Sequence, residues 1–148
     1  MPPLGNLEVL LVDAHGLHNT EFLSKMDPYV FLKYQTQEHK SKVASNEGSN
    51  PEWNETFVFK LSEGASDLLI RILDKDRFSA DDFLGEAIIP LKGVLTEGSI
   101  LPTPYNVVLM DKTYCGQIKV GLTFTPKAKC YVEEEEEEVE GGWKEGSL

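Results

Sequence analysis

The sequence predicts an all-β fold, an eight-stranded antiparallel Greek-key β-sandwich. Short runs rich in β-branched and aromatic residues recur along the chain, and Gly, Pro, Asn and Asp fill the gaps between them. No window carries a sustained helical stripe with capping residues. The 148 residues correspond to one domain, which is large enough to bury a core without disulfides.

The expected strands follow one another at intervals typical of a sandwich. Several alternate with a period of two: Leu68, Ile70 and Ile72 share one face of their run, and the residues between them share the other. The predicted strands cover residues 7–12, 28–34, 40–44, 55–59, 68–73, 84–89, 105–109 and 117–124.

Charge divides the chain into two predicted parts. Residues 1–130 form the sandwich domain, and residues 131–148 are an acidic tail with eight glutamates and one lysine. Like charges in a block repel one another and rarely pack, so we expect this tail to be disordered. The domain itself has 17 acidic and 13 basic residues, which is not the basic balance typical of nucleic-acid binding.

Other features favour a cytoplasmic, monomeric protein. No apolar run approaches the ~18 residues of a membrane span, and the first residues lack the basic region of a signal peptide. Cys115 and Cys130 lie outside any CxxC motif and are expected to be reduced.

Motifs of catalysis do not occur in the sequence, so we predict that the protein is not an enzyme. It contains no nucleophile elbow, phosphate-binding loop, dinucleotide-binding fingerprint or zinc-ligand spacing. Its three histidines are scattered, and we expect His39, which adjoins a lysine in a polar stretch, to be solvated.

Two of the predicted loops concentrate carboxylates. One holds Glu21 and Asp27, and the other holds Asp74, Asp76, Asp81 and Asp82. In an antiparallel sandwich both loops can lie at the same end, where two like charges ~4 Å apart repel by about 4 kcal/mol at an effective dielectric near 20. Oxygen ligands without histidine or cysteine suit calcium. The alternative is two solvated acidic loops.

Four motifs in order resemble the C2 domain, a calcium-dependent lipid-binding β-sandwich. LEVLLVDAHGL resembles its opening strand, residues 27–30 match DPYV, residues 50–57 match NPxWNExF, and residues 74–85 match DxDxxS followed by DFxG. The resemblance covers about residues 4–126. The chain as a whole resembles small single-domain plant members of the family, of the elicitor-responsive and phloem-protein types. The last predicted strand resembles one that opens the chain in other C2 domains, which implies the permuted type II topology.

The resemblance also implies a set of calcium ligands. They fall on Glu21, Asp27, Asp74, Asp76 and Asp82, with the Lys75 carbonyl and the Ser79 hydroxyl completing the shell. The family usually has aspartate where this chain has Glu21, which leaves calcium affinity and ion number open. Asp81 adjoins a ligand position and is not counted.

A membrane function follows from the resemblance and from the loop tips. Phe22, Leu23 and Phe78 are apolar residues in acidic loops, and we expect them to insert into a bilayer interface. Calcium would cancel the repulsion between the loops and anionic phospholipids. The expected function is calcium-dependent membrane binding in signalling or trafficking, including plant defence, with movement from the cytoplasm to the plasma membrane.

Two alternatives remain at this point. Lys33, Lys40 and Lys42 are expected on neighbouring strands, where they form either a groove for lipid head groups or a solvated polar face. The alternative function is an RNA- or protein-binding carrier or adaptor that uses the sandwich without calcium.

Overall fold

The computed structural model describes residues 3–21 and 24–127, which form eight strands and one short helix. The strands are β1 (Pro3–His15), β2 (Pro28–Tyr34), β3 (Gln37–Lys40), β4 (Glu52–Ser62), β5 (Asp67–Asp74), β6 (Asp82–Pro90), β7 (Ser99–Val108) and β8 (Tyr114–Pro126), and α1 (Lys92–Glu97) precedes β7. Phe22, Leu23, Cys130 and the predicted tail at 131–148 lie outside the described residues. Within the described ranges, no helix combines the length and apolar character needed to cross a membrane.

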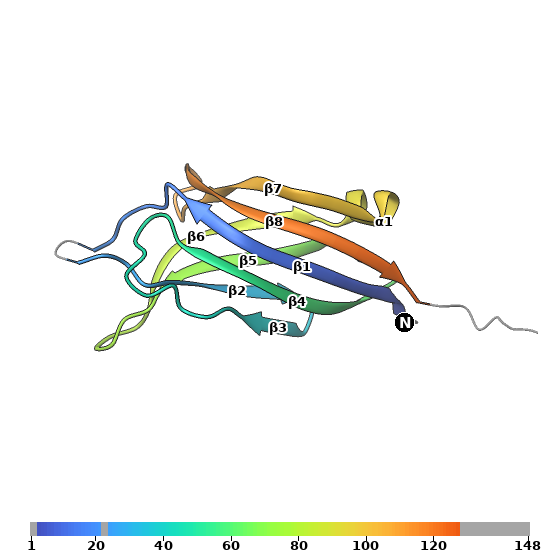
Figure 1. Cartoon of the computed structure of the whole chain (residues 1–148), viewed down its shortest axis with the longest axis horizontal. Helices are drawn as coiled ribbons and strands as arrows, with labels where there is room; N and C mark the ends of the chain where they lie inside the picture. Colours follow the sequence, from blue (N-terminus) through green and yellow to red (C-terminus); the bar gives the residue numbers. More distant parts are fainter. Residues whose placement is uncertain (1–2, 22–23, 128–148) are drawn as a thin grey trace, which may run out of the picture.

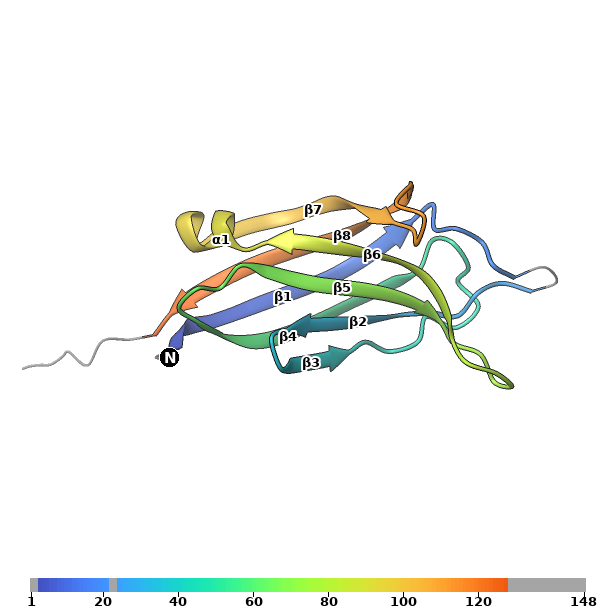
Figure 2. The same cartoon turned by 180° about the vertical axis from the view of Figure 1, so that it is seen from behind.

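The strands stack in two antiparallel layers, as predicted (Figures 1 and 2). One layer has the order β4-β1-β8-β7 and the other the order β3-β2-β5-β6. β6 and β7 are joined by the bridge pair Glu86↔Val108 alone. The strand that closes the described chain, β8, pairs with both β1 and β7, which confirms the type II arrangement.

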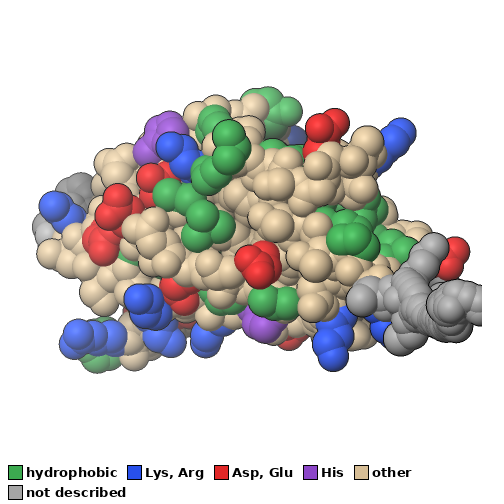
Figure 3. Space-filling view, turned by 45° about the vertical axis from the view of Figure 1, so that its right-hand side comes forward, with side chains coloured by type: hydrophobic (Ala, Val, Ile, Leu, Met, Phe, Trp, Pro, Cys, Tyr) green, Lys and Arg blue, Asp and Glu red, His purple; other side chains and the backbone are tan. Residues whose placement is uncertain are grey.

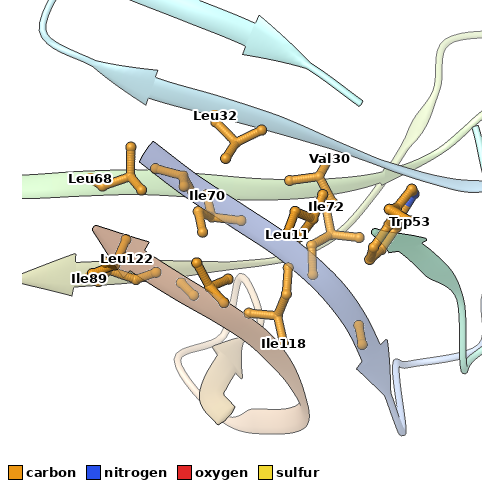
Figure 4. Packing of buried hydrophobic residues seen from close by; sticks show 14 of the residues in the cluster. Leu11, Val30, Leu32, Trp53, Leu68, Ile70, Ile72, Ile89, Ile118 and Leu122 are labelled. Carbon is orange, nitrogen blue, oxygen red and sulfur yellow. The ribbon is translucent and has the colours of Figure 1, made fainter. Parts of the chain in front are cut away.

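The core lies between the layers and explains why these runs form strands. In β1, Leu7, Val9 and Leu11 are fully buried, while Leu10 faces out, so the period of two in the sequence becomes one buried face. Figure 4 shows how side chains from both layers meet. The labelled members of this cluster are Leu11, Val30, Leu32, Trp53, Leu68, Ile70, Ile72, Ile89, Ile118 and Leu122.

The prediction of a third strand at residues 40–44 is wrong. β3 covers Gln37–Lys40 and follows β2 after a two-residue turn in which Gln35 has φ 53°. Gln35 is neither Gly nor Asn, so the sequence gives no turn signal there. Ser41 and Ala44 still donate backbone hydrogen bonds to β2 carbonyls, both at 2.8 Å, but outside a regular ladder.

Two further elements differ from the prediction. β7 begins at Ser99, six residues before the predicted start, although it contains Pro102 and Pro104. Proline is tolerated because β7 is an edge strand of its layer. The sequence does not predict the helix α1, since its six residues include one buried side chain, Val94, and no side-chain cap.

The two seams of the sandwich are closed in different ways. Beside β3 and β4, the Gln37 amide imitates a strand pair: Nε2 donates to the Lys60 carbonyl at 2.7 Å, and Oε1 accepts from the Lys60 N–H at 2.8 Å. The β6–β7 seam has its one bridge pair instead. Gly85 lies at that bridge with φ +146°, and a Cβ there would overlap the Val107 side chain.

We therefore expect Gly85→Ala to lower the free energy of unfolding by about 2–4 kcal/mol, because a strained φ adds to overpacking against Val107. The matched control is Gly98→Ala, since Gly98 has φ +85° and open space around it. This control should cost about 1–2 kcal/mol for the strained φ alone. Urea unfolding measures both, and equal costs would show that contact with Val107 does not constrain the seam.

Candidate metal centre

Four connections lie together at one end of the sandwich, opposite the N-terminus (Figures 1 and 2). They are the β1–β2, β3–β4, β5–β6 and β7–β8 loops, and we call this region the loop end. The antiparallel order brings the two acidic loops to the same end, as the sequence analysis expects.

Asp74 is the buried member of the acidic residues. It ends β5 and is 1% exposed. Its Oδ1 accepts the Asp27 N–H at 2.8 Å, and its Oδ2 lies 3.4 Å from the Thr20 hydroxyl. Because Asp74 pairs with Asp82 across β5 and β6, the first residue of β6 is also fixed beside it.

Carboxylate oxygens of Glu21, Asp74 and Asp82 all lie within 4.8 Å of one another. We call these three residues the carboxylate cluster. In the described part of the chain the ion pairs are Lys33–Glu38, Arg71–Glu86 and Lys75–Asp81, and none of them involves the cluster. The pKa of Glu21 is raised, first by a hydrogen bond to Asp74 and then by charge repulsion from it.

The other two predicted ligands, Asp27 and Asp76, lie beside this cluster but use their oxygens within the loops. Asp27 Oδ1 accepts the Asn46 N–H at 2.6 Å, which ties the β3–β4 loop to β2. Asp76 accepts the N–H of Phe78 at 2.9 Å and the hydroxyl of Ser79 at 2.8 Å. These two donors lower the pKa of Asp76.

Asp81 supports the β5–β6 loop. Its Oδ1 accepts the Asp76 N–H at 2.8 Å, its Oδ2 accepts the Tyr29 hydroxyl, and the Lys75 ammonium lies 3.9 Å away. The Asp76 N–H and the Tyr29 hydroxyl lower the pKa of Asp81. Burial, followed by the bond to Asp81, raises the pKa of Tyr29 to about 12.

Sequence reasoning missed three supporting residues, Thr20, Tyr29 and Asn46. Their contacts with carboxylates span 54, 52 and 19 positions of the chain. Spacing along the sequence carries no signal for such contacts; the nearest hint is that Tyr29 belongs to the DPYV segment.

The predicted membrane-contacting residues are described in part. Phe78, in the β5–β6 loop, is 95% exposed. Phe22 and Leu23 lie outside the described residues. A ring so exposed makes little packing contact within the described structure.

The predicted lysine surface is assembled in part. Lys33 lies on β2, 3.9 Å from the Glu38 carboxylate, and Lys40 ends β3, with its ammonium 5.6 Å from the centre of the Tyr29 ring. Lys42 lies beyond β3, in the β3–β4 loop. The expectation that all three share two strands is therefore wrong for Lys42, because β3 ends at Lys40 rather than at residue 44.

The expectation of a solvated His39 holds only in part, because its side chain is half-buried. Its ring packs edge-on against Phe59, with centroids 4.8 Å apart, and its Nε2 lies 2.9 Å from the Val58 carbonyl. The histidine helps to close the β3–β4 seam because the short turn after β2 places β3 over the edge of β4.

The donor set fits calcium. The carboxylate cluster offers hard oxygen ligands from three segments, and its members include neither histidine nor cysteine. Calcium accepts 6–8 such oxygens in irregular geometry, whereas zinc and copper favour nitrogen and sulfur. The burial of Asp74 is the observation that fits a bound cation best, because a buried carboxylate beside two others needs a compensating positive charge.

The sequence profile of the C2 domain family matches residues 5–107, and the chain belongs to this family. It is 54% identical over 143 residues to Elicitor-responsive protein 3 of Oryza sativa subsp. japonica, covering 97% of this chain and 98% of that protein. It is 52% identical over 142 residues to 16 kDa phloem protein 2 of Arabidopsis thaliana, covering 96% and 95%. These likenesses confirm the resemblance found in the sequence.

Among solved structures, a calcium-bound structure of two C2 domains of Extended-Synaptotagmin 2 is similar to this chain. The TM-score is 0.72 at 27% sequence identity, and the match covers 83% of this chain and 46% of that chain. The similarity therefore extends to a C2 protein that holds calcium.

Repulsion within the carboxylate cluster predicts the effect of removing one charge. In calcium-free buffer, Asp82→Asn should raise the free energy of unfolding by up to about 1 kcal/mol, because an exposed charge interaction is screened. Asp67→Asn, at the opposite end of β5, is the matched control and should change it little. Urea unfolding in EDTA measures both, and a destabilised Asp82→Asn would argue against repulsion.

Proposed function

We propose that the protein binds calcium at the loop end and, when loaded, binds anionic phospholipid membranes. One observation carries this proposal: three carboxylates converge within 4.8 Å, and none joins a described ion pair. Membership of the C2 family and the likeness to calcium-bound Extended-Synaptotagmin 2 support it.

The ligand set that we propose is Glu21, Asp27, Asp74, Asp76 and Asp82, with the Lys75 carbonyl and the Ser79 hydroxyl. The carboxylate cluster already brings three of these side chains together. Asp27 and Asp76 hold the two flanking loops in place through Asn46 and Ser79. Bound calcium would supply the positive charge that offsets the carboxylates and attracts lipid phosphate.

Membrane contact follows from the same geometry. Without a cation the acidic loop end repels an anionic bilayer, and with calcium the repulsion is offset. The exposed Phe78 ring belongs to an acidic loop, so a bilayer approached by the loops meets this ring as well. We include Phe22 and Leu23 in the contact, since they follow Glu21 in the chain.

The cellular role that we propose is signalling by a monomer that moves from the cytoplasm to the plasma membrane when calcium rises. A relative is named an elicitor-responsive protein, which supports a part in the plant defence response. This is a binding function and includes no catalytic step.

Vesicle co-sedimentation with and without calcium tests the proposal. The protein should pellet with vesicles of phosphatidylserine and phosphatidylcholine much more strongly when calcium is present than in EDTA, and should stay in solution with phosphatidylcholine alone. Asp74→Asn combined with Asp82→Asn should weaken the calcium-dependent binding by about tenfold or more, because two cluster carboxylates lose their charge. Asp67→Asn is again the control.

The contrary result is equally clear. Equal pelleting with anionic vesicles in calcium and in EDTA would contradict the proposal and point to a surface that needs no calcium, such as that of Lys33, Lys40 and Lys42. Salt-sensitive retention of RNA in EDTA would favour the carrier function instead.

Phe78→Ala separates calcium binding from membrane insertion. The variant should bind anionic vesicles about tenfold more weakly, because a buried phenylalanine side chain is worth about 1.5–3 kcal/mol. Its calcium-induced rise in Tm should match that of the parent protein, since Phe78 contributes only a backbone N–H to Asp76. Leu101→Ala, a similarly exposed residue on β7, is the control. Unchanged vesicle affinity would exclude Phe78 from the contact.

A further inference from the structure

The β6–β7 seam opens into a groove that the calcium site does not use. Its volume is about 640 Å³, and side chains of β5, β6, β7, β8 and the β7–β8 loop line it. The volume lies within the roughly 300–1,000 Å³ of small-molecule sites. The opposite seam is closed by Gln37 and His39 side chains, so the groove is a consequence of the single bridge between β6 and β7.

Large apolar side chains line the groove but remain exposed. Ile88 is 61% exposed, Met110 is 77% exposed and Tyr114 is 70% exposed. They come from two strands and a loop, and all three line the same groove. Figure 3 shows one face of the molecule, on which hydrophobic side chains lie in several separate groups among charged and other side chains. Exposed apolar side chains that gather in a groove of this volume favour a binding surface.

The charges of the groove select the sign of its ligand. Arg71 and Lys112 are the cations in its lining, and Glu86 is the carboxylate. Arg71 lies 3.8 Å from Glu86 and 5.8 Å from the centre of the Phe83 ring. A guanidinium has five N–H donors, so a single ion pair at 3.8 Å leaves further donors for an anion.

We propose that this groove binds one molecule of anionic phospholipid, with its phosphate at Arg71 and Lys112 and an acyl chain along Ile88, Met110 and Tyr114. The β7–β8 loop belongs to the loop end, so the groove opens beside the surface that would face the bilayer; the inference rests on the proposed function in this respect. The groove shares no residue with the carboxylate cluster, so its binding requires no calcium.

A titration in EDTA tests this proposal with a lipid that stays monomeric. We expect dihexanoyl phosphatidic acid to shift the NMR signals of Ile88, Met110 and Tyr114 in a saturable way. Dihexanoyl phosphatidylcholine should bind several-fold more weakly, because its head group has no net charge. Inorganic phosphate should leave the Ile88 signal unchanged, which distinguishes a lipid site from a phosphate site.

Matched variants locate the binding. Ile88→Glu should weaken phosphatidate binding by about tenfold or more, since it places a carboxylate on the apolar wall. Leu101→Glu adds the same charge at an exposed leucine outside the groove and should leave affinity unchanged. Arg71→Gln should abolish the preference for phosphatidate over phosphatidylcholine, and retained thermal unfolding confirms that each variant folds.

Three results would overturn the inference. The first is equal affinity of Ile88→Glu and the parent protein for phosphatidate. The second is a set of NMR shifts confined to the residues of the carboxylate cluster or of the lysine surface. The third is a shift of the Ile88 and Met110 signals that depends on protein concentration without lipid, which would make the groove a contact with a second copy. Calcium-dependent pelleting is a separate measurement, so a failure of the proposed function is distinguishable from a failure of the groove.

Discussion

The buried carboxylate of Asp74 sets the conditions for the whole loop end. Burial disfavours a charge unless a donor or a cation compensates it, and the Asp27 N–H is the shortest donor contact that the described residues provide. The compensation is incomplete because Glu21 and Asp82 add negative charge beside it. The convergence of these carboxylates therefore produces electrostatic repulsion, and Ile70 and Ile72, fully buried in the core, keep β5 from moving away to relieve it.

Hydrogen bonds from several loops and strands hold the acidic residues of the loop end in place. Asn46 connects the β3–β4 loop to Asp27, and Tyr29 connects β2 to the β5–β6 loop through Asp81. Trp53, buried at the start of β4, donates its indole N–H to the Pro28 carbonyl at 3.3 Å, so the same strand end is held from a third direction. The polar network thus positions carboxylates that would otherwise separate.

The sequence predicts the sandwich, its topology and the pairing of two acidic loops, because period-two alternation and linked motifs are local signals. It does not predict β3 correctly, since Gln35 adopts a positive φ in the turn before β3 and glutamine is not a typical residue for such a turn. It also does not predict that Asp76 accepts hydrogen bonds from its own loop, or that His39 packs on Phe59, because both depend on how the chain meets itself in space. The β6–β7 groove has no sequence signal for the same reason.

The domain is a spacer between the ends of its described chain and the carboxylate cluster, since Gly5 pairs with Pro126 at the far end of the sandwich. Both ends of the described chain lie together, opposite the carboxylates, and the 13 residues of β1 span about 40 Å at roughly 3.3 Å per residue. That separation is several times the ~8 Å Debye length at physiological ionic strength. Lys127, the last described residue, therefore lies outside the electrostatic reach of the carboxylate cluster. The distance therefore separates the carboxylate cluster from the charges at the described ends of the chain.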